Sequence, residues 1–172
     1  IKVEKADLPE KVMDKSASDR LLKAICACPH GAFKMIPGMA HVAETSTNLS
    51  IVKSEKGIVT VTSMLRSSID SKRPDVANRI RSVFELAGAQ TDTAGEYPGW
   101  EPKFDSPVLQ MFKDVYKKKF GAEAKITATH GGLECGIIRS KYPKMDALSI
   151  GPTIKYPHSP DEQLDIETVQ KL

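Results

Sequence analysis

Alternation of apolar and polar residues predicts a β-hairpin in the first half of the chain. Residues 45–52 and 58–65 are rich in threonine, valine and isoleucine, and the segment 53–57 between them has the length and the glycine of a hairpin loop. Along the second strand two sets of residues alternate, namely Val59, Val61 and Ser63, and Thr60, Thr62 and Met64. We therefore expect one face of this strand to pack and the other to be solvated or to meet a partner.

Helical periodicity predicts a helix on each side of the hairpin. The cap-type residues Ser16, Ser18 and Asp19 precede an apolar pattern that reaches about Ala27. After the hairpin, apolar residues recur at helical spacing over 76–87, with Asp70 and Ser71 as candidate caps, Pro74 in the first turn and Gly88 at the end.

Two further segments complete the expected fold of the first half. The prolines and glycines between 29 and 38 predict a loop, and residues 89–94 can form a strand. The order helix, strand, strand, helix, strand is that of an incomplete α+β sandwich of the ferredoxin-like type, without its first strand.

The second half has a different pattern. Residues 95–102 are rich in glycine and proline and indicate a linker, so we place a domain boundary near Ala94. Pro107 opens an amphipathic helix that runs to about Phe120, short strands are expected at 126–129 and 147–150, and a last helix begins near Ile166. Alternating helices and strands predict a parallel-type α/β layer.

Composition is that of an ordinary soluble globular protein. The 172 residues are 40% hydrophobic and 27% charged, with a net charge of +3. No apolar run approaches the roughly 20 residues that span a bilayer, and no secretory signal is visible, so we expect no membrane partner. The one basic run, Lys117 to Lys119, predicts a solvated helix face and no nucleic-acid partner. Because the chain begins at Ile1 and stops at Leu172 inside a predicted helix, we expect it to be a piece of a longer protein.

Three cysteines indicate neither a disulfide framework nor a zinc knot. They are Cys26, Cys28 and Cys135, an odd and sparse set that fits a reducing cytoplasm. The run from Cys26 to His30 lacks the second pair of ligands that a zinc finger needs. We interpret it as structural, with Cys26 on the apolar face of the first helix beside Leu22.

The strongest candidate for a functional side chain is His158, which lies in a loop between two prolines. Pro157 and Pro160 surround it, and proline fixes its own φ and favours extended geometry in the preceding residue. Asp161 and Glu162 follow at once and could orient the imidazole of a metal ligand. A catalytic zinc takes about three protein ligands, and no second histidine stands at ligand spacing, so His158 alone cannot build a metal site. The alternative is an ordinary turn with a partly exposed histidine.

Two other places could bind a substrate. His130 is followed by Gly131 and Gly132, and paired glycines let a ligand approach backbone N–H groups. The alternative is a tight turn. Arg66, at the end of a predicted strand, could bind a carboxylate with two hydrogen bonds, or it could pair with Asp70.

Four motifs closely resemble the C-terminal half of bacterial aminoacyl-histidine dipeptidases, the Xaa-His dipeptidases that are similar to carnosinase. The resemblance covers most of the chain from about Glu44 onward, and the motifs stand in the right order and spacing. They are LRSSID at 65–70, AGEYPGW at 94–100, HGGLECG at 130–136 and SIGPTIKYPHSPDE at 149–162. The family usually has alanine where this chain has Gly131.

The resemblance implies a place for each part of the chain. In these di-zinc exopeptidases an inserted lid domain interrupts an α/β catalytic domain. Residues 1–94 would be the later part of the lid and dimerisation domain, and 95–172 the C-terminal segment of the catalytic domain. His158 would be the last zinc ligand, Arg66 the lid arginine that holds the substrate carboxylate, and Gly132 a loop glycine that contacts substrate.

The function implied is a cytoplasmic metallo-dipeptidase that hydrolyses Xaa-His dipeptides. Two zinc ions, or cobalt or manganese in their place, would activate a water molecule, and a glutamate would accept its proton. The remaining ligands and that glutamate are absent from this chain, so we expect it to be inactive alone and expect a homodimer as the parent form. The alternative is a stand-alone dimerisation or binding module that uses the edge of the predicted hairpin.

Overall fold

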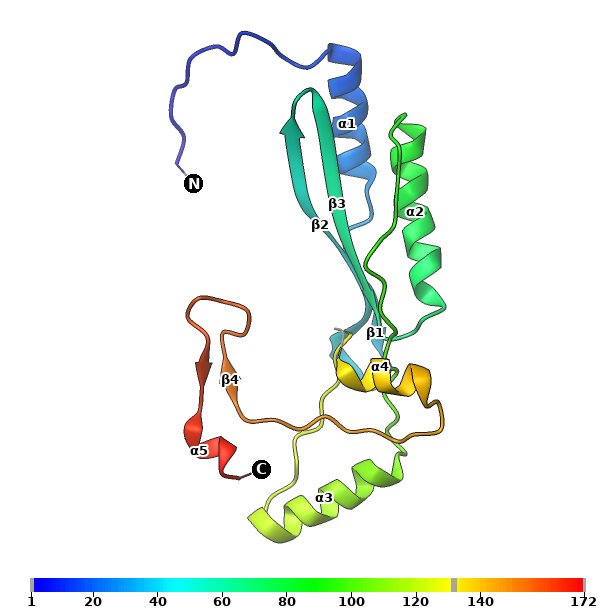
Figure 1. Cartoon of the computed structure of the whole chain (residues 1–172), viewed down its shortest axis with the longest axis vertical. Helices are drawn as coiled ribbons and strands as arrows, with labels where there is room; N and C mark the ends of the chain where they lie inside the picture. Colours follow the sequence, from blue (N-terminus) through cyan, green and yellow to red (C-terminus); the bar gives the residue numbers. More distant parts are fainter. Residues whose placement is uncertain (1, 131–132, 172) are drawn as a thin grey trace. The chain divides into compact units, whose positions relative to one another are not determined.

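The computed structural model describes residues 2–130 and 133–171, which form two compact units (Figure 1). Unit 1 contains residues 2–96 together with Thr129 and His130, and unit 2 contains the other described residues from Tyr97 onward. Helices are combined with antiparallel strands, so the expected α+β class is confirmed. No helix in the described part of the chain has the length and hydropathy needed to cross a bilayer.

Unit 1 is built on a three-stranded antiparallel sheet in the order β1-β2-β3. The strands are β1 (Gly31–Ile36), β2 (Met39–Glu55) and β3 (Ile58–Ser67). The expected hairpin is confirmed, but its turn has only two residues, Lys56 and Gly57, with φ of 50° and 78°. Two successive positive φ values match the right-handed twist of the flanking strands, which is why the strands continue up to the turn.

β1 replaces the loop that the sequence predicted between residues 29 and 38. Ile36 pairs with Met39, so Pro37 and Gly38 form a two-residue turn, with Gly38 at φ 81°. Proline followed by a glycine of positive φ is typical of a type II turn. The residues that looked like breakers therefore join two strands.

Two helices cover one face of the sheet. They are α1 (Lys15–Ala27) and α2 (Lys72–Leu86), which run beside the β2–β3 hairpin in Figure 1. Ala24, Cys28 and Phe84 form the buried core, and partly buried side chains pack on it, namely Leu49, Val61, Ile80, Val83 and Ala87. Both predicted helices are confirmed.

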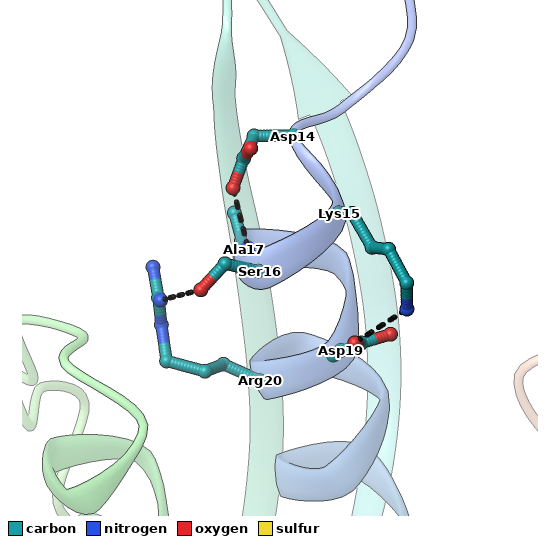
Figure 2. Close-up of polar contacts among 6 residues, drawn as sticks. All are labelled: Asp14, Lys15, Ser16, Ala17, Asp19 and Arg20. Carbon is teal, nitrogen blue, oxygen red and sulfur yellow. Dashed lines mark hydrogen bonds and ion pairs between the residues drawn. The ribbon is translucent and has the colours of Figure 1, made fainter.

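The start of α1 differs in detail from the expectation. Asp14, rather than Ser16, Ser18 or Asp19, is the N-cap, and its carboxylate accepts from the Ala17 N–H at 3.1 Å (Figure 2). Asp19 instead pairs with Lys15 at 2.8 Å, and the Ser16 hydroxyl accepts from Arg20 at 2.7 Å (Figure 2).

The buried face of α1 also differs from the expectation. Leu22 and Cys26 are exposed, and Ala24 and Cys28 are buried instead. The expected placement of Cys26 on the packed face is therefore wrong.

Residues 89–94 do not form the strand that the sequence predicted. This segment returns along α2, because the Thr91 hydroxyl donates to Glu85 at 2.9 Å and Arg81 donates to the Thr93 hydroxyl at 3.2 Å. Its polar side chains therefore bond to the helix surface and its backbone takes no place in the sheet.

Unit 2 contains α3 (Pro107–Phe120), α4 (Glu134–Lys141), α5 (Ile166–Val169) and a small hairpin of β4 (Ile154–Lys155) and β5 (Gln163–Leu164). The predicted helix at 107–120 is confirmed, with Ser106 as its cap. Residues 126–129 and 147–150 are not strands, so the predicted parallel layer is absent from the described residues. A strand exists only with a neighbour, and these segments have none within the described chain.

Candidate functional site

Arg66 stands on the uncovered face of β3. Exposure alternates along this strand: Val59, Val61, Ser63 and Leu65 are partly buried toward the helices, whereas Thr60, Thr62, Met64 and Arg66 are exposed. This confirms the predicted alternation, and it directs the Arg66 side chain away from the core of unit 1. We call the uncovered side of the β2–β3 hairpin the open face.

In the described part of the chain, no ion pair joins Arg66 to Asp70, the partner expected in its alternative role. Asp70 pairs with Arg73, whose guanidinium nitrogen lies 2.8 Å from the Asp70 carboxylate. Among the described residues Arg66 forms no ion pair with any carboxylate. A guanidinium that is exposed and has no internal counter-ion can accept an external anion.

Two side chains accompany Arg66 on the open face. Ser46 is its direct cross-strand partner in the antiparallel register, a position in which Cβ atoms lie about 5 Å apart. The Ser46 hydroxyl is in turn 2.7 Å from Nε2 of His130, 84 residues further along the chain. The pKa of His130 is lowered, first because the imidazole is partly buried and second because the Arg66 guanidinium repels its protonated form.

These contacts extend what the sequence could show. His130 was expected to matter as part of a glycine loop, but its contact with Ser46 was not foreseen, and Ser46 was not a candidate. The register of the hairpin is the one signal that could have placed Ser46 opposite Arg66. Gly131 and Gly132, the loop glycines of the expected site, lie outside the described residues.

A buried carboxylate lies two residues before Ser46 on the same strand. Glu44 is only 3% exposed, and its Oε2 is 3.1 Å from Nζ of Lys34. Its other oxygen has no hydrogen-bond partner among the described residues. Lys34 thus offsets the charge of Glu44, so this carboxylate does not need Arg66 as its counter-ion.

His158 lies in the loop between β4 and β5. Its backbone is left-handed, with φ of 66°, and Tyr156 also has a positive φ of 52°. The expectation that the residue before Pro157 would be extended is therefore wrong. Such φ values cost energy in residues other than glycine, and they persist where surrounding bonds impose them. Here the His158 N–H donates to Glu162 at 2.8 Å, and the Ser159 N–H donates to the Tyr156 carbonyl at 3.3 Å.

The imidazole of His158 is exposed, and neither neighbouring acid bonds to it. Glu162 accepts from the His158 backbone, and the Asp161 N–H donates to the Ser159 hydroxyl at 3.0 Å. Within the described ranges, no group of three histidine, cysteine, aspartate or glutamate side chains lies close enough to hold a metal ion. Both ring nitrogens of His158 are thus accessible, and the described chain can offer this residue as a single ligand.

The cluster of Cys26, Cys28 and His30 is structural. Cys28 is buried, with its sulfur 4.0 Å from the Ser63 hydroxyl, and Cys26 is exposed. His30 accepts the Leu49 N–H at Nδ1 over 3.1 Å, which ties the end of α1 to the sheet. Cys28 and His30 thus have structural contacts, whereas Cys26 does not lie on the packed face that the interpretation gave it.

The chain is similar to known dipeptidases. It is 40% identical over 151 residues to the cytosol non-specific dipeptidase of Escherichia coli (strain K12), which covers 88% of this chain and 31% of that protein. The crystal structure of aminoacylhistidine dipeptidase from Vibrio alginolyticus matches with a TM-score of 0.82 and 43% identity, over 96% of this chain and 34% of that one. No protein-family model matches. The chain thus spans about a third of the length of these relatives, and the resemblance inferred from the motifs is confirmed.

Proposed function

We propose, from this homology to dipeptidases, that the chain is part of a metal-dependent dipeptidase. The structural observation that carries the proposal is Arg66, a guanidinium on an open sheet face that forms no ion pair among the described residues. A dipeptidase acts on peptides with a free carboxyl end, and such a carboxylate is the natural partner of an accessible arginine.

Each unit would have its own task in this enzyme. We assign residues 1–94 to the later part of the lid and dimerisation domain, and 95–172 to the C-terminal segment of the catalytic domain. Arg66 holds the substrate carboxylate in this assignment, and Gly132 contacts the substrate. The proposed parent is a cytoplasmic homodimer.

His158 is the residue of this chain that we assign to the metal. Its exposed imidazole, held by backbone bonds rather than by side-chain contacts to the ring, suits a ligand, but it supplies one donor where a catalytic zinc takes about three. The other ligands and the general base then come from the rest of the protein, which agrees with the third of the relatives' length that the chain spans. A pair of zinc ions, or of cobalt or manganese, would polarise the scissile carbonyl and lower the pKa of a bound water.

The substrate class we propose is a dipeptide that ends in histidine. One matched relative is named as an aminoacylhistidine dipeptidase and the other as a non-specific dipeptidase. The motifs resemble the Xaa-His enzymes, which favours the specificity of an aminoacylhistidine dipeptidase. Comparing hydrolysis of glycyl-L-histidine with that of glycyl-L-leucine by the full-length protein would separate the two.

Zinc content of the full-length enzyme tests the ligand role. His158→Ala should reduce bound zinc and lower kcat/KM for glycyl-L-histidine by more than about 100-fold, since even residues that only support a ligand cost about 10- to 100-fold. His41→Ala is the matched control, because it removes an exposed histidine from β2. Unchanged zinc content in His158→Ala would refute the assignment.

The 172-residue chain provides a second test. We expect no hydrolysis of glycyl-L-histidine when the chain is assayed alone with added zinc, because it holds one proposed ligand. Robust activity would contradict the need for the rest of the protein.

A stand-alone binding or dimerisation module is the second candidate. The hairpin favours it, because large apolar side chains are exposed there: Ile51 at 54%, Ile58 at 68% and Met64 at 50%. Light scattering of the chain would identify a dimer. A dimer that lacks zinc and dipeptide affinity even in the full-length context would favour the module over the enzyme.

A further inference from the structure

Ser46, Arg66 and His130 meet on the open face although they come from three separate segments. Register places Ser46 opposite Arg66, and a 2.7 Å hydrogen bond joins Ser46 to His130. Both β2 and β3 are long strands whose opposite face is packed by helices, so the positions of Ser46 and Arg66 are fixed by the scaffold of unit 1. A preorganised group of this kind binds better than one that must be ordered by the ligand.

We propose that Ser46 and His130 belong to the carboxylate site of Arg66: the Ser46 hydroxyl donates to the substrate carboxylate, and His130 is the positioning residue that aims it. This inference rests on the proposed function and deepens it. Arg66 alone would attract any anion, whereas a second, directed donor beside it would select a carboxylate held at a fixed orientation.

The hydrogen bond determines what Ser46 can do. A serine hydroxyl has one proton, and if His130 accepts that proton at Nε2, Ser46 presents only lone pairs to a ligand. If His130 carries its proton on Nε2, it donates to the Ser46 oxygen and leaves the hydroxyl proton for the carboxylate. The proposal therefore commits His130 to the neutral tautomer with hydrogen on Nε2.

The surrounding charges support a neutral His130. Arg66 on β3 disfavours the imidazolium, and partial burial acts in the same direction. Glu44 on β2 and Lys34 on β1 pair with each other at 3.1 Å, and Asp70 and Arg73, which follow β3, pair at 2.8 Å. A neutral His130 preserves the full attraction of Arg66 for an anion and adds a donor without adding a competing charge.

A comparison of two substrates tests the inference in the full-length enzyme. Glycyl-L-histidine carries the carboxylate, and glycyl-L-histidinamide replaces it with a neutral amide. The measured quantity is the ratio of their kcat/KM values, from which the concentration of active enzyme cancels, so partial misfolding of a variant does not affect it.

Ser46→Ala and His130→Ala should each lower this ratio by about tenfold, the effect of one hydrogen bond to a charged group. Ser46→Thr keeps the hydroxyl, and His130→Gln keeps an N–H near the position of Nε2, so both should retain most of the ratio. Thr62→Ala, on the same open face of β3, is the matched control and should leave it unchanged.

Arg66→Ala separates failure of this inference from failure of the proposed function. If Arg66→Ala lowers the ratio by about 100-fold while Ser46→Ala and His130→Ala slow both substrates equally, the two residues are merely structural and the inference is overturned. If Arg66→Ala also leaves the ratio unchanged, the carboxylate role of Arg66 fails as well.

Discussion

Arg66 and His158, the two residues proposed to act on substrate and metal, stand in contrasting surroundings. Arg66 belongs to a ten-residue strand whose other face is packed by two helices, around Ala24, Cys28 and Phe84. His158 belongs to a loop between strands of two residues each, and its conformation depends on backbone bonds within that loop. The chain by itself therefore fixes the proposed carboxylate site, whereas local turn geometry places the proposed metal ligand.

The largest expected effect comes from removing the core that packs on the other face of β3 at Val61. Phe84→Ala should lower the free energy of unfolding by about 3 kcal/mol, since it leaves a cavity under the sheet. Leu86→Ala is the control on the same helix, because that side chain is 89% exposed and should change stability little. Urea unfolding followed by circular dichroism measures both. Equal losses in the two variants would contradict the assignment of the core.

Unit 2 has a well-defined anchor of its own at the start of α3. The Ser106 hydroxyl accepts from the Leu109 N–H at 3.0 Å and donates to Asp146 at 2.7 Å, and Asp146 also accepts from the Val108 N–H at 3.2 Å. Ser106→Ala should cost about 1 kcal/mol in urea unfolding, as loss of an N-cap usually does. Ser140→Ala, at an exposed position of α4, is the control and should be nearly neutral.

The same anchor predicts a pH dependence. The pKa of Asp146 is lowered, chiefly because the Ser106 hydroxyl and then the Val108 N–H bond to its carboxylate. A carboxyl with a lowered folded-state pKa stabilises the fold above its unfolded value, about 4, and this contribution is lost as the pH falls through the folded value. Between pH 5 and pH 2, the Ser106→Ala variant should lose less of its free energy of unfolding than the wild type does. A loss of unchanged size would mean that Ser106 does not act on Asp146.

Much of the structure that positions Arg66 could be predicted from the sequence, because local sequence patterns determine it. Continued by one step, the period-2 pattern of β3 places Arg66 with Thr60, Thr62 and Met64, and cap residues and prolines located the starts of α2 and α3. The cross-strand register was harder to predict. The expected five-residue loop would pair Val52 with Ile58 and thus bring Glu44 opposite Arg66, whereas the two-residue turn and an irregularity between Leu49 and Ile51 bring Ser46 there.

Other features depended on contacts that no local pattern contains. His130 reaches Ser46 across 84 residues, and such pairing is invisible to periodicity or spacing. Residues 126–129 and 147–150 have the composition of strands but no strand neighbour in the described chain. The left-handed φ of Tyr156 and His158 likewise runs against the preference of the residues themselves.

Strain at His158 can be measured in the chain itself. His158→Gly and His158→Ala both remove the imidazole, but only glycine adopts a φ of 66° without cost. The glycine variant should therefore be more stable than the alanine variant by about 1 kcal/mol, as judged by hydrogen exchange of the β4–β5 amides. The control pair is Asp161→Gly and Asp161→Ala, at a position without positive φ, where glycine should give no advantage. If the glycine variant gained no more stability over the alanine variant at position 158 than at position 161, the His158 backbone would store no strain.

The smallest expected effect is the change in the pKa of His130 when the positive charge of Arg66 is removed. Its pKa is lowered first by burial and second by Arg66, so Arg66→Gln should raise the pKa of His130 while leaving it below the usual value near 6.5. A histidine with a lowered folded-state pKa makes the fold lose stability as the pH falls from about 6.5 toward that lower value, because the unfolded chain binds the proton more readily. Arg66→Gln should narrow the pH interval between the unfolded-state and the folded-state pKa of His130. NMR titration of the imidazole measures the shift, with Arg79→Gln on α2 as a control that removes a different positive charge. A pKa of His130 that responds equally to both substitutions would mean that Arg66 and His130 do not share one site, and it would separate the two groups that the open face brings together.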